Sequence, residues 1–201
     1  METTQIPTGT YICVDVETAG PSPGQYSLLS IGACTVFEAQ SSFYIELKPV
    51  NGNIYLESLS VSQLSIARLI QEGVEPNEAM TRFDAWIETI VPPGQKPIFV
   101  AFNAAFDWMF ISHYFYTYLG RNPFGHAALD IKSYFMGLTG VHWGETSMRK
   151  IAPNYLSKNG LDHHALLDAL DQAEIFRQLL AQAKRKSLDR MGDQLEEEWL
   201  H

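Results

Sequence analysis

The sequence predicts an α/β fold in which strands dominate the first 47 residues and helices dominate the rest. Apolar and polar residues alternate early in the chain, as they do in half-buried strands, and recur later at helical spacing. A short, wholly apolar segment at 97–101 lies between two helical segments, which is typical of a strand buried on both faces.

The N-terminal part is expected to form three antiparallel strands. Residues 11–17 alternate and are rich in β-forming side chains, and the Gly- and Pro-rich segment 18–24 ends this strand. Two further strands at 28–37 and 43–47 are separated by a short polar link, which predicts a hairpin. Together the three strands would form a meander.

Most of the other elements are predicted to be helices. A short helix at 63–72 ends at Gly73, and Pro76 opens a longer helix that ends at the Pro-Pro-Gly segment 92–94. The remaining helical segments are 104–119, capped by Asn103 and apolar on nearly all sides, 129–138, whose first residues can belong to a strand, 147–156, and 165–183.

The length of 201 residues fits one domain, which we place at 1–183. Residues 184–201 are rich in charge and are expected to extend the last helix or to form a loosely held tail. No apolar run approaches the roughly 18 residues that span a membrane, and the N-terminus lacks a secretory signal. Cys13 and Cys34 lie in strand-like runs where buried, reduced thiols are expected, so the sequence predicts a cytoplasmic protein with no membrane partner.

Four carboxylates lie where the predicted strands end and the predicted helices begin. Asp15 and Glu17 are two residues apart on one strand and would point to the same face of the sheet. Asp107 comes about one helical turn after Asn103, and Asp168 lies in the first turn or so of the last helix. Functional sites in open α/β sheets gather at strand ends, so we expect these acids to share one cleft.

This set of acids suits two divalent metal ions, because hard cations prefer several oxygen ligands. His163 precedes Asp168 by five residues, and on one continuous helix the two side chains would point about 140° apart. We therefore expect His163 on the loop that enters the helix, where an imidazole can remove a proton from a water molecule.

Each of these segments alone has an ordinary structural explanation. An acid pair on a strand, a capped helix with a solvated acid, and an exposed helix start with a surface histidine are all common. Their occurrence in this order, each on the expected element, favours a metal site that activates water against a phosphodiester.

The same residues resemble the DEDDh exonucleases, the superfamily of proofreading 3′→5′ exonucleases, ribonuclease T and oligoribonuclease. The family name refers to four acids and one histidine, which are matched here by Asp15, Glu17, Asp107, Asp168 and His163. The neighbouring residues match as well: 14–18 resembles the first family motif, 100–107 the second and 163–169 the third.

The resemblance covers about residues 8–182 and implies a ribonuclease H-like α/β fold. It implies a mixed five-stranded sheet, an antiparallel meander plus parallel strands, flanked by helices. The pair Leu129 and Asp130 resembles the short fifth strand of that sheet.

The resemblance also implies roles for individual residues. Asp15, Glu17, Asp107 and Asp168 would bind two Mg²⁺ or Mn²⁺ ions, and His163 would be the general base of the reaction. The residues expected to contact the substrate are Thr18, Ala19, Asn103 and His163.

The resulting hypothesis is a metal-dependent 3′→5′ exonuclease that releases nucleoside 5′-monophosphates from the 3′ ends of single-stranded DNA or RNA. The net charge of −9 argues against tight binding of long nucleic acid, so single-stranded 3′ ends or short oligonucleotides are the expected partners. Arg149, Lys150 and Lys158 form a candidate local track for the nucleic-acid backbone.

Two alternatives stay open. One is a phosphodiesterase of the same fold that acts on dinucleotides or short oligonucleotides, and the other is a catalytically decayed nucleic-acid-binding module. The choice between DNA and RNA and the formation of a homodimer are also open, because no motif reports on them.

Overall fold

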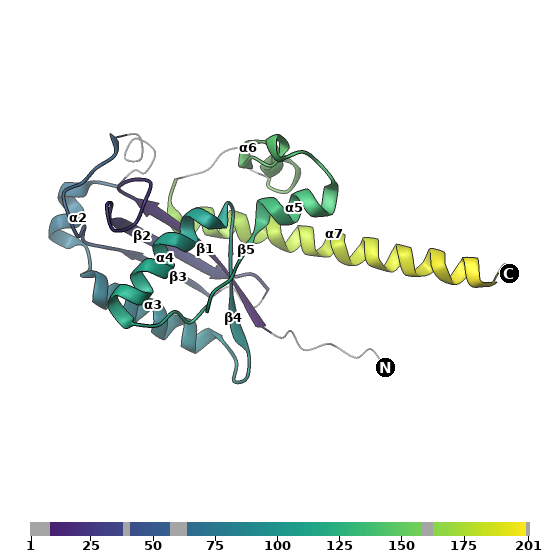
Figure 1. Cartoon of the computed structure of the whole chain (residues 1–201), viewed down its shortest axis with the longest axis horizontal. Helices are drawn as coiled ribbons and strands as arrows, with labels where there is room; N and C mark the ends of the chain where they lie inside the picture. Colours follow the sequence, from purple (N-terminus) through teal and green to yellow (C-terminus); the bar gives the residue numbers. More distant parts are fainter. Residues whose placement is uncertain (1–8, 38–40, 57–63, 158–162, 200–201) are drawn as a thin grey trace.

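Five strands form one mixed sheet in the order β3-β2-β1-β4-β5 (Figure 1). The computed structural model describes residues 9–37, 41–56, 64–157 and 163–199, with side chains described as far as residue 188. The strands are β1 (Gly9–Thr18), β2 (Leu28–Thr35), β3 (Ser42–Glu46), β4 (Lys96–Ala101) and β5 (Ala128–Asp130). β1, β2 and β3 pair antiparallel, whereas β4 and β5 join in parallel, so the predicted fold class is confirmed.

The helices cover both faces of this sheet. They are α2 (Ile66–Glu72), α3 (Pro76–Ile90), α4 (Ala104–Leu119), α5 (Ile131–Thr139), α6 (Met148–Ile151) and α7 (Ala165–Trp199). α3 and α4 pack together on one face, while α7 crosses β1, β2 and β3 on the other with α5 beside it (Figure 1).

Several predicted boundaries shift in the structure. The segment expected to be helical at 147–156 is α6 followed by a 3₁₀ turn, Ala152–Asn154, because Pro153 cannot continue the α-helical hydrogen bonding. The first residue of the helix expected at 63–72 lies outside the described residues, and α2 begins after Ser65, whose side chain accepts the Arg68 main-chain N–H. α7 continues without a break through residue 184, and its last part runs away from the sheet (Figure 1).

Alternation along β1 divides the core into two apolar layers. Ile12, Val14 and Val16 face α3 and α4, where they join Phe83 and Phe110 among buried side chains. The intervening positions face α7, where Cys13 joins a second buried cluster. Asp15 and Glu17 continue this second row, so the period of the strand places them on the face that α7 covers.

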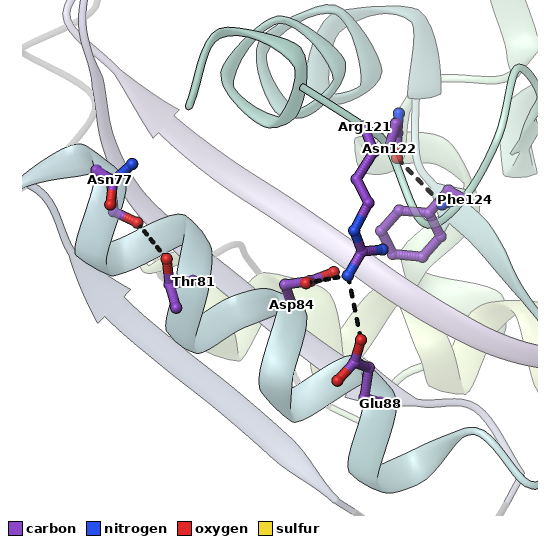
Figure 2. Close-up of polar contacts among 7 residues, drawn as sticks. All are labelled: Asn77, Thr81, Asp84, Glu88, Arg121, Asn122 and Phe124. Carbon is purple, nitrogen blue, oxygen red and sulfur yellow. Dashed lines mark hydrogen bonds and ion pairs between the residues drawn. The ribbon is translucent and has the colours of Figure 1, made fainter. Parts of the chain in front are cut away.

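A surface cluster of ion pairs fixes the end of α4 against α3. Arg121 follows α4 and donates to Asp84 at 2.5 Å and to Glu88 at 3.1 Å, both on α3 (Figure 2). Asn122 beside it accepts the Phe124 main-chain N–H (Figure 2). The Phe124 ring is buried against Phe99 of β4. This corner leads the chain from α4 into β5 and therefore helps to place the β5 edge of the sheet.

Within the described ranges, no helix combines the length and apolarity needed to cross a membrane.

Candidate active site

β1 carries its two acids beyond the end of its parallel neighbour. The pairs between β1 and β4 run from Gly9 with Lys96 to Cys13 with Val100, whereas β1 itself continues to Thr18. Asp15 and Glu17 therefore lie at the carboxyl end of the parallel strands, where α/β proteins place their sites.

Asp168 completes a compact cluster of carboxylates with these two residues. One oxygen atom from each of Asp15, Glu17 and Asp168 lies within 4.8 Å of the others. Asp168 comes from the first turn of α7 and is only 4% exposed. Three of the four acids predicted from the sequence therefore come together with their oxygen atoms facing one another.

Asp107 lies in the first turn of α4 and is bound to the backbone of β1. Its Oδ1 accepts the main-chain N–H of Val16 at 3.1 Å, and the residue is 4% exposed. Val16 stands between the two β1 acids and beyond the last β1–β4 pair, so this carboxylate satisfies a strand N–H past the end of β4. The part of Asp107 as a metal ligand stays a prediction.

Without bound cations, burial and mutual repulsion destabilise the ionised forms of these acids. Burial raises the pKa of Asp15 well above its usual range, and the neighbouring acids raise it further, with Asp107 first. Burial and then Asp168 raise the pKa of Glu17 to about 7. Burial raises the pKa of Asp107 to about 8, although the Val16 N–H favours its ionised form.

Oxygen donors that converge under these conditions fit a divalent cation. Several carboxylates close together favour protonation unless a positive charge compensates them. Mg²⁺ and Mn²⁺ prefer carboxylate ligands, and Asp15, Glu17 and Asp168 offer three within one small volume. The donor set therefore suits the metal ions expected from the sequence.

His163 lies two residues before the start of α7 and outside the helix, as its spacing from Asp168 predicts. Its backbone is left-handed, with φ at +49°, and its side chain is exposed. His163 and Glu17 line the same cavity of about 220 Å³, together with Tyr44 and Arg68. His163 and one member of the acidic cluster, Glu17, thus share one opening.

Four residues around that cavity were not singled out by sequence reasoning. The rings of Tyr44 and His164 stack with their centroids 4.4 Å apart. The Tyr44 hydroxyl donates to Glu46 at 2.9 Å, and Glu46 pairs with Arg68 of α2 at 2.6 Å. These contacts connect β3 and α2 to the residue that follows His163, and no local pattern links segments so far apart in the chain.

Asn103 is the N-cap residue of α4, as predicted, but its side chain does not supply the capping bond. Its backbone is in a left-handed conformation, with φ at 65°. Asp130 at the end of β5 accepts the Ala104 N–H at 2.8 Å instead, and it also caps α5 through Ser133. The exposed Asn103 side chain remains a predicted substrate contact.

The other two predicted substrate contacts lie at the end of β1. The Thr18 hydroxyl donates to the Gly20 carbonyl at 2.9 Å. Ala19 is 1% exposed, its N–H donates to the Ser27 carbonyl and its carbonyl accepts the Tyr55 N–H, each at 2.8 Å. The backbone groups of Ala19 are thus used within the chain, and a substrate contact of either residue stays a prediction.

The predicted basic track is described in part. Arg149 and Lys150 lie on α6, where the Lys150 ammonium pairs with Glu145 at 2.5 Å. Lys158 lies outside the described residues.

Comparisons with known proteins agree with this geometry. The exonuclease family model, of the ribonuclease T type, matches residues 12–176. The 3′-5′ DNA exonuclease Cap18 of Escherichia coli is 45% identical over 180 residues, which are 90% of this chain and 96% of that protein. Ribonuclease T of Baumannia cicadellinicola subsp. Homalodisca coagulata is 33% identical over 190 residues, covering 87% of this chain and 84% of that protein.

A solved structure supports the same fold. The nuclease domain of 3′hExo, a DEDDh family member bound to rAMP, has a TM-score of 0.70 and 13% identity to this chain. The match covers 87% of this chain and 93% of that domain. With the acids Asp15, Glu17, Asp107 and Asp168 and with His163 in place, the chain belongs to the DEDDh family of 3′→5′ exonucleases, a class of hydrolases.

Proposed function

We propose that this exonuclease removes nucleoside 5′-monophosphates from the 3′ ends of single-stranded DNA in a reaction that depends on Mg²⁺ or Mn²⁺. The observation that carries the proposal is the convergence of Asp15, Glu17 and Asp168 within 4.8 Å, beside a cavity that His163 also lines. Support for DNA comes from the 45% identity to a DNA exonuclease, which covers nearly the whole of both chains.

The acids would hold the ions and set the geometry of the reaction. Asp15, Glu17 and Asp168, together with Asp107 from α4, are the proposed ligands of two cations. Bound ions of this kind lower the pKa of a coordinated water and stabilise charge on the attacking and leaving oxygens. These buried carboxylates need little reorganisation to bind the ions, because the fold has already oriented them.

His163 is the proposed general base. Its place before α7 and its exposed side chain leave the imidazole free to approach a water at the cluster and to accept its proton. The proposed contacts of the terminal nucleotide are Asn103, Thr18 and Ala19.

End-labelled oligonucleotides test this function directly. With Mg²⁺, a 20-nucleotide single-stranded DNA labelled at its 5′ end should shorten stepwise from the 3′ end, and chelation should stop the reaction. Asp15→Asn should reduce the rate by more than 1,000-fold, because the cluster loses a ligand on which the ions depend (roughly 4 kcal/mol of barrier). Undiminished cleavage by that variant would sink the proposal.

A phosphodiesterase for dinucleotides or short oligonucleotides is the second candidate, favoured by the net charge of −9. Two-nucleotide and 20-nucleotide substrates of both DNA and RNA separate the candidates. Faster turnover of the two-nucleotide substrate would favour the second. A catalytically decayed module is disfavoured, because every chemical position of the family motif is kept.

The proposal includes a cytoplasmic location, supported by the buried, free thiols of Cys13 and Cys34. Formation of a homodimer stays a prediction, which sedimentation of the purified chain would check.

A further inference from the structure

Gln172 links the acidic cluster to the end of β4. It lies on α7, one helical turn after Asp168, and is 3% exposed. Its Nε2 donates to Asp15 Oδ1 at 2.6 Å, and its Oε1 accepts the Phe102 main-chain N–H at 2.8 Å. The single amide therefore connects α7, β1 and the residue that follows β4.

The chemistry of these partners fixes which way the amide points. A main-chain N–H can only donate, so the oxygen of the amide must face Phe102. The nitrogen must then face Asp15, where an ionised carboxylate can only accept. The Cys13 thiol lies 3.8 Å from the same Oε1 and agrees with this orientation. Reversing the amide would oppose two donors at one end and two acceptors at the other.

An amide held in this way restrains the Asp15 carboxylate. The short contact engages Oδ1 on the side of α7 and limits rotation of the carboxyl group about its χ2 angle. Asp15 lies in the cluster whose oxygen atoms converge within 4.8 Å, so its rotation decides which lone pairs face Glu17 and Asp168. Because the partner at Phe102 is a main-chain N–H, the restraint is anchored to the backbone at the end of β4 and not to another mobile side chain.

We propose that Gln172 is a positioning residue that orients the Asp15 carboxylate toward the cluster before a cation binds. The inference rests on the proposed part of Asp15 as a metal ligand. Groups that orient metal ligands through hydrogen bonds typically contribute 10- to 100-fold to metal affinity. Removing the amide should therefore weaken cation binding by about that factor in a protein that still folds.

Gln172→Met tests the inference, because methionine has a similar length and neither donates nor accepts strongly. Chelator-stripped protein is titrated with Mn²⁺ by calorimetry in the absence of nucleic acid. The expected dissociation constant is about 10- to 100-fold higher than in the wild type. Raised Mn²⁺ should restore most of the exonuclease rate, since the ligands themselves remain.

Gln178→Met is the matched control on the same helix. Gln178 also uses its amide within the fold, donating to the Tyr155 carbonyl at 2.9 Å and to Glu174 at 2.6 Å, but it touches no residue of the cluster. It should leave the Mn²⁺ affinity unchanged. If both variants weakened Mn²⁺ binding equally, any disturbance of α7 would be sufficient to lower the affinity. This result would overturn the positioning role of Gln172.

Gln172→Asn keeps an amide that is one methylene too short to reach both partners, and it serves if the methionine variant fails to fold. A purely structural role of Gln172 would lower the thermal midpoint without changing the affinity of the folded protein. Wild-type affinity in the folded Gln172 variants would overturn the inference while leaving the proposed function intact. Failure of the wild type to bind Mn²⁺ would overturn the metal role of Asp15 and the inference with it.

Discussion

Gly32 of β2 and Ala165 of α7 approach so closely that a β-carbon on Gly32 would stand 2.1 Å from the Ala165 carbonyl carbon. This contact lets the first turn of α7 rest directly on the sheet. Asp168 lies in that turn and His163 just before it, so the absence of a side chain at position 32 helps to place two of the proposed catalytic residues.

Gly32→Ala should therefore push the start of α7 away from β2. We expect a destabilisation of about 1–3 kcal/mol from the overpacking and a loss of at least tenfold in kcat from displaced Asp168 and His163. Thermal unfolding and cleavage of end-labelled DNA measure the two effects. Gly137→Ala is the control: Gly137 lies in α5 with open space around it, so alanine there should stabilise the helix and leave the rate unchanged.

The pKa of Glu17 predicts how the metal-free protein responds to pH. In the folded state this pKa is about 7, above the usual value of 4.5, so folding disfavours the ionised form. The penalty is absent below pH 4.5, grows as the pH rises toward 7 and is then complete at about 3 kcal/mol. The free energy of unfolding in the presence of a chelator should fall between pH 5 and pH 8.

Glu17→Gln isolates this contribution, because it removes the ionisable group and keeps the size of the side chain. Its stability should fall less between pH 5 and pH 8 than that of the wild type, by about 2–3 kcal/mol. Saturating Mg²⁺ should flatten the wild-type curve, since a cation favours the ionised acids. Urea unfolding at several pH values measures the stability of the wild type, of Glu17→Gln and of the wild type with Mg²⁺. If the stability of the variant and of the wild type fell equally with pH, the raised pKa of Glu17 would be contradicted.

Asp107 combines a structural bond with a charge, and two substitutions separate them. Asp107→Asn keeps an oxygen for the Val16 N–H, so the fold should be at least as stable while the exonuclease rate falls by 100-fold or more. Asp107→Leu also removes the acceptor and leaves a buried N–H without its partner, at a cost of about 1–3 kcal/mol. Thermal unfolding and cleavage rates of the two variants test whether the hydrogen bond and the charge of Asp107 have separate roles.

The stack of Tyr44 on His164 should affect the rate through the neighbouring His163. Aromatic pairs contribute about 0.5–1.5 kcal/mol beyond their burial, so Tyr44→Leu should lower kcat by roughly two- to tenfold as the segment before α7 loosens. Tyr44→Phe keeps the ring and removes the hydroxyl that donates to Glu46, and it should retain most of the activity. A leucine variant as fast as the phenylalanine variant would show that the stack does not act on His163.

Sequence patterns located the acids well because each belongs to a strong local signal. The period of two along β1 puts Asp15 and Glu17 on one face, and the capped start of a helix identifies the neighbourhood of Asp107. The spacing from His163 to Asp168 correctly places the histidine outside the helix. The side chain that accepts the Ala104 N–H at the start of α4 could not be inferred in this way, because Asp130 comes from a different part of the chain.

The sequence by itself determined the class of fold, the order of the elements and the residues proposed to carry the chemistry, since periodicity and short motifs are local properties of the chain. Only the tertiary structure decided which groups hold those residues in place. Gln172 meets Asp15 across 157 positions, and Gly32 admits the start of α7, because the sheet order and the crossing of α7 over β1, β2 and β3 bring these segments together. Contacts of this kind depend on the packing of whole elements, which no short stretch of sequence encodes.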